Sequence, residues 1–191
     1  MKLSRLIDSM ENVRINGFSA DQWNASSSPE ITSIHYRSNE VRPGGMFFAI
    51  KGQQADGHQY IGDAISKGAA VVVVDAAQQM NAGHPVNHGD VVVVCVGNTR
   101  KALAAASSMF FNNPSEKMYL IGITGTNGKT TTAYLIEHIL LKSGIDVGVI
   151  STINYRYHGK IYGNPLTTPE SLELQEILDM VIRPMEQEGS S

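Results

Sequence analysis

The sequence predicts an α/β fold in two units, in which short β-strands alternate with helices. Three observations support this prediction. Two continuous β-branched apolar runs are typical of strands buried on both faces, segments with helical apolar spacing accompany them, and a glycine-rich turn joins a further strand to a helix. A polar, proline-containing break at residues 112–115 places the boundary between residues 1–113 and residues 114–191.

The first unit is expected to be a small α/β domain. Its apolar, β-branched and aromatic runs indicate strands, and its segments with apolar residues at helical spacing indicate helices. Gly68 suits the end of the first helix, and Thr99 can cap the start of the second. The predicted strands are residues 31–36, 46–50, 69–74 and 91–96, and the predicted helices are residues 60–67 and 99–111.

The second unit is expected to begin with a βαβ arrangement, whose two strands are parallel and joined by a right-handed crossover. A hairpin that turns at His158-Gly159 should follow, and then a helix that starts at Thr168-Pro169 and stops before Pro184. Two parallel strands do not complete a sheet, so the unit is expected to be a truncated parallel domain. The predicted βαβ elements are strand 119–124, helix 130–143 and strand 146–151, and the hairpin covers residues 154–162.

Composition excludes several classes of protein. Fifteen basic and eighteen acidic residues give a net charge of −3, which argues against a dedicated nucleic-acid binder. No run approaches the roughly 20 apolar residues of a membrane span, and the first ten residues lack the apolar core of a signal peptide. We therefore expect a soluble, cytoplasmic protein with no membrane partner. The single cysteine, Cys95, lies in an apolar run and is expected to be a buried thiol.

The strongest chemical signal is the string GITGTNGKTTT at residues 122–132, which follows an apolar run and opens a predicted helix. Gly125 and Gly128 would allow backbone N–H groups to turn toward phosphate oxygens, and the helix N-terminus adds partial positive charge. Lys129 can reach the β- and γ-phosphates, and the Thr130 hydroxyl can bind Mg²⁺. The strict phosphate-loop spacing would place glycine at Ile123, so a tight turn that merely contains Gly-Lys-Thr is the alternative.

This loop resembles the nucleotide loop of the Mur ligases, which are ATP-dependent amide-forming enzymes of peptidoglycan precursor synthesis. The related folylpolyglutamate synthetases typically have glycine where this chain has Thr130. Three further groups of residues extend the resemblance over about residues 31–188. Residues 42–52 with 56–58, 64 and 68–69 resemble the family's uridine-nucleotide-binding domain, residues 98–102 and 113–115 resemble the segment before the loop, and Leu166-Thr-Thr-Pro-Glu170 resembles the signature of the branch that extends UDP-MurNAc-L-Ala-D-Glu.

The resemblance implies a UDP-MurNAc-binding domain at residues 1–113 and part of the central ATP-binding domain at residues 114–191. It also implies a role for individual residues, with Lys129 and Thr130 as the catalytic candidates and Thr130 as the Mg²⁺ ligand. The implied ATP-binding residues are Gly125, Thr126, Asn127, Gly128, Lys129, Thr130 and Thr131, and the implied substrate-binding residues are Ser38, Gln53, Gln54, Ala55, Thr167 and Thr168.

Each substrate-binding candidate also has a simpler interpretation. Ser38 could be only a turn residue at the end of a strand, and the family usually has Asp-Ser-Arg where this chain has Arg37-Ser38-Asn39. Gln53 and Gln54 could be solvent-facing loop residues, and Thr167 and Thr168 could serve only to cap a helix. His58 is expected to be structural, because a lone loop histidine is more often structural or exposed than catalytic.

The function that the resemblance implies is carboxylate activation. The D-glutamate carboxylate of UDP-MurNAc-L-Ala-D-Glu accepts the γ-phosphoryl group of ATP, and the acyl phosphate is attacked by the amine of an incoming amino acid. That amino acid is L-Lys or meso-diaminopimelate. Alone, the chain is expected to be inactive and to bind ATP weakly. The alternatives are a non-catalytic sugar-nucleotide-binding module from a truncated or decayed copy, and an unrelated P-loop kinase or GTPase, which leaves the first unit unexplained.

Overall fold

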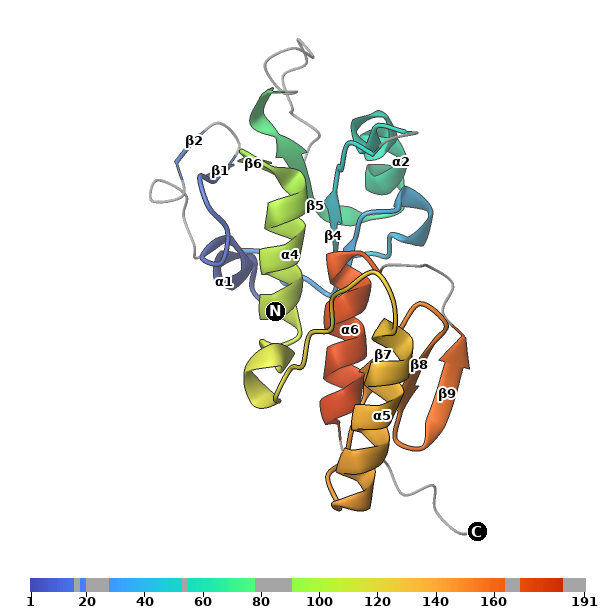
Figure 1. Ribbon diagram of the computed structural model, residues 1–191. Helices are drawn as coiled ribbons and strands as arrows, with labels where there is room; N and C mark the ends of the chain where they lie inside the picture. The colour runs from blue at the N-terminus through green and yellow to red at the C-terminus, as the bar shows by residue number, and fades with distance from the viewer. Residues whose placement is uncertain (16–17, 20–27, 53–54, 78–90, 164–168, 184–191) are drawn as a thin grey trace, which may run out of the picture. The chain divides into compact units, whose positions relative to one another are not determined.

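The computed structural model describes residues 1–15, 18–19, 28–52, 55–77, 91–163 and 169–183 (Figure 1). The chain divides into two compact units, Met1–Asn112 and Asn113–Ser191. This division lies one residue from the boundary expected from the sequence. Among the described residues, no helix has the length and apolar character needed to cross a membrane.

The first unit contains a six-stranded sheet with the strand order β2-β1-β6-β5-β4-β3. Strands β3 to β6 are parallel, whereas β1 runs antiparallel to β6 and β2 antiparallel to β1. The four strands predicted for this unit are therefore confirmed. The strands are β1 (Arg14–Ile15), β2 (Phe18–Ser19), β3 (Ser33–His35), β4 (Gly45–Phe48), β5 (Ala69–Asp75) and β6 (Val92–Val96).

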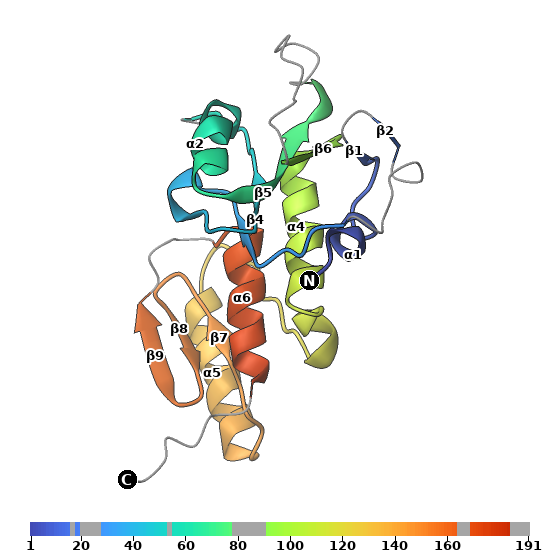
Figure 2. The same cartoon turned by 180° about the vertical axis from the view of Figure 1, so that it is seen from behind.

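The core of the first unit forms on both faces of the central strands, which explains their continuous apolar sequence. On one face Phe47, Val72 and Val93 pack with Ala64 of the short helix α2 (Ile61–Ser66). Neighbouring strand residues point to the opposite face, where Phe48 is also fully buried. The longer helix α4 (Thr99–Phe110) contacts β4 and β5. The short helix α1 (Leu3–Ile7) packs in turn against α4 (Figures 1 and 2). Strands that are buried on both faces need apolar residues at successive positions, and the β-branched runs noted in the sequence provide them.

The start of α4 corrects one detail of the sequence analysis. Asn98, not Thr99, is the N-cap, and its side-chain Oδ1 accepts a hydrogen bond from the backbone N–H of Lys101 at 2.9 Å. Thr99 is the first helical residue and is buried. Asn and Thr both act as caps, so sequence preference alone did not distinguish two adjacent candidates. Cys95 is buried as expected, and burial raises the pKa of its thiol.

The second unit combines two long helices with a small antiparallel sheet, β7-β8-β9. The predicted hairpin is confirmed, because β8 and β9 pair around a turn in which His158 and Gly159 both have positive φ. Two long helices form as well, but the second one begins later than expected. Its N-cap is Glu170, whose carboxylate accepts from the backbone N–H of Ser171, whereas the sequence analysis expected the start at Thr168-Pro169. The elements are η5 (Pro114–Lys117), α5 (Lys129–Lys142), β7 (Val149–Ile150), β8 (Asn154–Tyr157), β9 (Lys160–Gly163) and α6 (Ser171–Ile182).

The predicted parallel βαβ pair is not formed in the second unit. Residues 119–124 carry no strand pairing, and β7 pairs antiparallel with β8 instead. A strand needs a neighbour to accept and donate its backbone hydrogen bonds, and no described strand pairs with residues 119–124. The apolar side chains of this segment are consequently open to solvent, with Tyr119 101% and Ile121 61% exposed.

Candidate functional site

The glycine-rich turn leads directly into α5, as the phosphate-loop prediction requires. Gly125 and Gly128 have φ values of +148° and +76°, which L-amino acids with side chains rarely adopt. Gly128 is the N-cap of α5, and its carbonyl accepts from the backbone N–H of Thr132 at 2.9 Å. The remaining N–H groups of the first helical turn have no partner within the helix, which suits them to bind an anion.

Lys129 folds back over the loop that precedes it. Its Nζ donates to the carbonyl oxygen of Gly125 at 2.5 Å and lies 3.5 Å from that of Thr126. The side chain is exposed, as are Asn127 and Thr131, whereas Thr130 is half-buried. The ammonium group is therefore held at the loop and remains accessible to a phosphate.

The residues around the loop fit a nucleotide better than a protein-bound metal. Within the part of the chain that the structure describes, no group of three His, Cys, Asp or Glu side chains could hold a metal ion. The Thr130 hydroxyl remains the candidate Mg²⁺ contact, as in loops where the metal is bound mainly by phosphate oxygens and water. Lys129 and the start of α5 supply positive charge for the phosphates themselves.

A buried ion pair that the sequence analysis missed holds α5 against the hairpin. Glu137 is only 7% exposed, and its Oε1 lies 3.2 Å from Nε of Arg156 on β8. The Arg156 guanidinium also stacks 4.6 Å from the ring centroid of Tyr134, whose hydroxyl donates to Asn154 Oδ1 at 3.1 Å. The sequence signal for this contact was a glutamate in a largely apolar helix stretch, residues 134–141.

In the first unit, the candidate residues that the structure describes lie where parallel strands end. Ser38 begins the short 3₁₀ helix η3 (Ser38–Glu40), directly after β3. Its hydroxyl bonds to Asp63 on α2, and its carbonyl accepts from Nζ of Lys67 at 3.3 Å. The hydrogen bonds from Lys67 and Ser38 lower the pKa of Asp63. Ser38 is thus held in place by α2 and half-exposed, so a role in binding and a purely structural role at the turn both remain predictions.

Of the three neighbouring substrate-binding candidates Gln53, Gln54 and Ala55, the structure describes Ala55. It is exposed in the loop that follows β4, and its carbonyl accepts from the backbone N–H of Gly52 at 2.9 Å. Ser38 and Ala55 both follow the carboxyl ends of parallel strands, the edge where α/β sheets bind ligands. Gln53, Gln54, Thr167 and Thr168 lie outside the described residues, so their predicted contacts stay predictions.

His58 is structural, as expected, and anchors the base of this loop. Its Nε2 accepts from the backbone N–H of Asp75 at 3.2 Å, so the ring proton is on Nδ1, which donates to Asp56 Oδ1 at 2.6 Å. Asp56 also accepts from the backbone N–H of His58 at 3.0 Å. Burial disfavours the charged carboxylate, but the hydrogen bonds from His58 outweigh that effect and lower the pKa of Asp56.

The lowered pKa of Asp56 predicts that the stabilising contact between Asp56 and His58 is lost in acid. The pKa of Asp56 is lower in the folded chain than in the unfolded chain. The stabilisation that the ionised Asp56 carboxylate provides is therefore complete above about pH 4, the ordinary aspartate pKa, and is lost as the pH falls through the folded-state pKa. We expect Asp56→Asn to lower the unfolding free energy near neutral pH and to flatten its decline in acid. Urea unfolding at several pH values measures this, with the exposed Asp8→Asn as control. An unchanged acid profile in Asp56→Asn would contradict the assignment.

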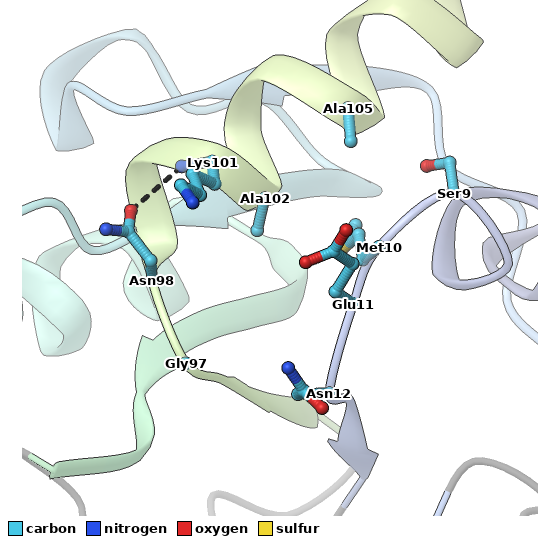
Figure 3. Close-up of a pocket in the computed structure, with 9 residues that line it drawn as sticks. All are labelled: Ser9, Met10, Glu11, Asn12, Gly97, Asn98, Lys101, Ala102 and Ala105. Atoms are coloured by element: carbon cyan, nitrogen blue, oxygen red, sulfur yellow. Dashed lines mark hydrogen bonds between the residues drawn. The ribbon is translucent and has the colours of Figure 1, made fainter.

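A hollow of about 390 Å³ lies elsewhere in the first unit and was not anticipated from the sequence (Figure 3). We call it the Glu11–Lys101 pocket. Its walls are the turn between α1 and β1 and the first turns of α4. Its lining residues are Ser9, Met10, Glu11, Asn12, Gly97, Asn98, Lys101, Ala102 and Ala105.

Two family models match the chain, one in each unit. The model described as "Mur ligase family, catalytic domain" matches residues 30–111, and that described as "Mur ligase middle domain" matches residues 123–186. Together they include the described parts of both candidate sites. The matched segments agree with the two units into which the structure divides.

Several curated relatives are named UDP-N-acetylmuramoyl-L-alanyl-D-glutamate--2,6-diaminopimelate ligase. The protein of this name from Clostridium tetani is 40% identical over 183 residues, covering 95% of this chain and 35% of the relative. That from Aquifex aeolicus is 47% identical over 142 residues, covering 74% of this chain and 28% of the relative. The chain therefore spans about a third of the length of these relatives.

Solved structures of similar proteins support the fold. One titled "Structure of UDP-N-acetylmuramoyl-L-alanyl-D-glutamate--2, 6-diaminopimelate ligase" aligns with a TM-score of 0.60 at 19% identity, over 86% of this chain and 32% of that one. A MurF crystal structure from Acinetobacter baumannii aligns with a TM-score of 0.54 at 21% identity, over 94% and 32% of the two chains. At such identities the likeness concerns the fold alone.

Proposed function

This chain belongs to the Mur ligase family, and from that premise we propose that it is the N-terminal part of an ATP-dependent amide ligase. The observation that carries the proposal is the glycine-rich turn, in which two glycines at positive φ place Lys129 and the start of α5 around one accessible surface. We assign residues 1–113 to binding the UDP-MurNAc part of the substrate. Residues 114–191 are assigned to the central ATP-binding domain.

The proposed reaction joins an amino acid to UDP-MurNAc-L-Ala-D-Glu through an acyl phosphate. A carboxylate and a triphosphate are both anionic, so their approach requires positive charge at the point of transfer. Lys129 and the N-terminus of α5 supply that charge from this chain, and Thr130 would contact Mg²⁺, which neutralises further phosphate charge when bound. The name shared by the relatives favours 2,6-diaminopimelate over lysine as the incoming amino acid. A reaction that consumes ATP and a nucleotide-linked precursor is proposed to occur in the cytoplasm.

The substrate's nucleotide end is assigned to the carboxyl edge of the first unit. Ser38 is fixed by Asp63 and Lys67, and Ala55 lies in a loop whose base is held by His58. Gln53 and Gln54 complete this proposed contact, and Thr167 and Thr168 are proposed to bind the muramoyl part. The chain covers about a third of its relatives, so catalysis is assigned to the longer protein and these residues alone are expected to be inactive.

A non-catalytic sugar-nucleotide-binding module is the second candidate. No specific observation favours it, because a module that only holds a sugar nucleotide does not need the phosphate-loop features. Lys129 remains accessible at the loop and Gly128 keeps the backbone conformation that opens α5. Both features are explained by ATP binding.

Binding of UDP-MurNAc-L-Ala-D-Glu tests the proposal directly. We expect a saturable calorimetric titration, and Ser38→Ala should weaken binding about 3- to 10-fold, the value of one neutral hydrogen bond of about 0.5–1.5 kcal/mol. Ser66→Ala is the matched control, because the Ser66 hydroxyl donates within α2, to the Asp63 carbonyl at 2.8 Å. If the wild-type chain does not bind the compound, or Ser66→Ala weakens binding as much as Ser38→Ala, the assignment of this edge is wrong.

A further inference from the structure

The Glu11–Lys101 pocket forms where two chain turns meet beside the end of β6. Arg14 of β1 pairs antiparallel with Cys95 of β6, which brings the turn before β1 next to the turn that leads from β6 into α4. Figure 3 shows Glu11 and Asn12 on the first turn facing Asn98 and Lys101 on the second. The pocket is thus a product of tertiary pairing, since its two walls are more than 80 residues apart in the sequence.

Opposite charges stand on the two walls of this pocket. Glu11 and Lys101 are both exposed, and within the described ranges neither forms an ion pair with another side chain. The amide of Asn98 is already used to cap α4. Asn12, held at a φ of +53°, contributes a second amide beside Glu11. Ala102 and Ala105 add small apolar side chains that leave room between the walls.

This arrangement favours a ligand that carries both signs of charge. An anion beside Lys101 would be repelled by Glu11, and a cation beside Glu11 would be repelled by Lys101 and by the positive end of α4. A zwitterion satisfies both side chains at once. The volume of about 390 Å³ lies at the lower end of the range for small-molecule sites, roughly 300–1,000 Å³.

We propose that the Glu11–Lys101 pocket binds a small zwitterion of the α-amino acid class, with its carboxylate at Lys101 and its ammonium group at Glu11. The Asn12 amide also lines the pocket and offers both a hydrogen-bond donor and an acceptor. Neither Ser38 nor Ala55, the proposed nucleotide contacts, lines this pocket, and its existence does not depend on ligase activity.

The test uses L-alanine and two analogues that each keep one charge, propionate and isopropylamine. Amide chemical shifts of Gly97, Asn98 and Lys101 are followed by NMR while each compound is added. We expect saturable shifts with L-alanine and at least tenfold weaker binding of either analogue. Lys101→Met should weaken L-alanine binding at least fivefold, and so should Glu11→Gln.

Matched substitutions in the second unit control for general charge effects. Lys142→Met and Glu116→Gln remove the same charges from exposed positions and should leave L-alanine binding unchanged. Two results overturn the proposal: propionate binding as tightly as L-alanine with no effect of Glu11→Gln, which would make this an anion site, or shifts that never saturate with L-alanine. Glu11 and Lys101 are exposed, so their substitution leaves the core intact and each variant can be measured.

Discussion

Replacing Lys129 by methionine is expected to weaken binding of Mg²⁺-ATP to this chain by about 10- to 100-fold. A hydrogen bond to a charged group contributes about 1.5–3 kcal/mol, and each 1.4 kcal/mol corresponds to a factor of ten in affinity. Among the described residues, the hydrogen bonds of the Lys129 ammonium go to the carbonyl oxygens of Gly125 and Thr126, so it can turn to a phosphate at little cost. Because we expect weak binding by the wild-type chain, NMR titration with millimolar nucleotide is the suitable measurement.

Lys142→Met provides the control for the Lys129 variant. Lys142 is exposed at the other end of the same helix, so this substitution removes the same charge far from the loop. Its affinity for nucleotide should match that of the wild-type chain. Equal affinities of the Lys129 and Lys142 variants would show that nucleotide binds elsewhere or without the loop lysine.

Most of the first unit could be predicted from the sequence, because the apolar pattern of each predicted element agrees with its position in the folded unit. Its strands β5 and β6 are short, continuous, β-branched runs, and each finds a parallel neighbour in the same sheet. The predicted N-cap of α4 was wrong by one residue, because Asn98 and Thr99 have similar preferences for the N-cap position. Sequence patterning is reliable here because the central strands β4, β5 and β6 are buried by residues of the same unit.

The second unit shows where such patterning stops being sufficient. The apolar segment 119–124 has the composition of a buried strand, but composition does not provide the neighbour that a strand must bond to. The hairpin at His158-Gly159 was predictable because its turn and its two strands are local in sequence. The glycine-rich turn that opens α5 was predictable for the same reason. The Glu11–Lys101 pocket, in contrast, depends on residues distant in sequence and carried no motif.

Breaking the ion pair between Glu137 and Arg156 is expected to lower the unfolding free energy by about 2–3 kcal/mol. Removing one partner of a buried pair costs about 3–5 kcal/mol, because the other charge is left without compensation. The cost is smaller here because the Arg156 side chain is 31% exposed, whereas the side chain of Glu137, taken without its backbone, is 9% exposed. Urea unfolding of Glu137→Gln, Arg156→Gln and the double variant measures the loss in each.

The double variant separates loss of the pair from loss of either side chain. If the charges act on each other, the double variant should be less destabilised than the sum of the two single variants, by at least about 0.5 kcal/mol. The pair Arg37–Glu40 is the control, since its side chains are 41% and 49% exposed and its removal should cost less than about 1 kcal/mol. Strict additivity would mean that Glu137 and Arg156 contribute through packing alone. Coupling would mean that the helix bearing Lys129 is fixed to the hairpin by a charge pair, so that the same substitutions should also weaken nucleotide binding.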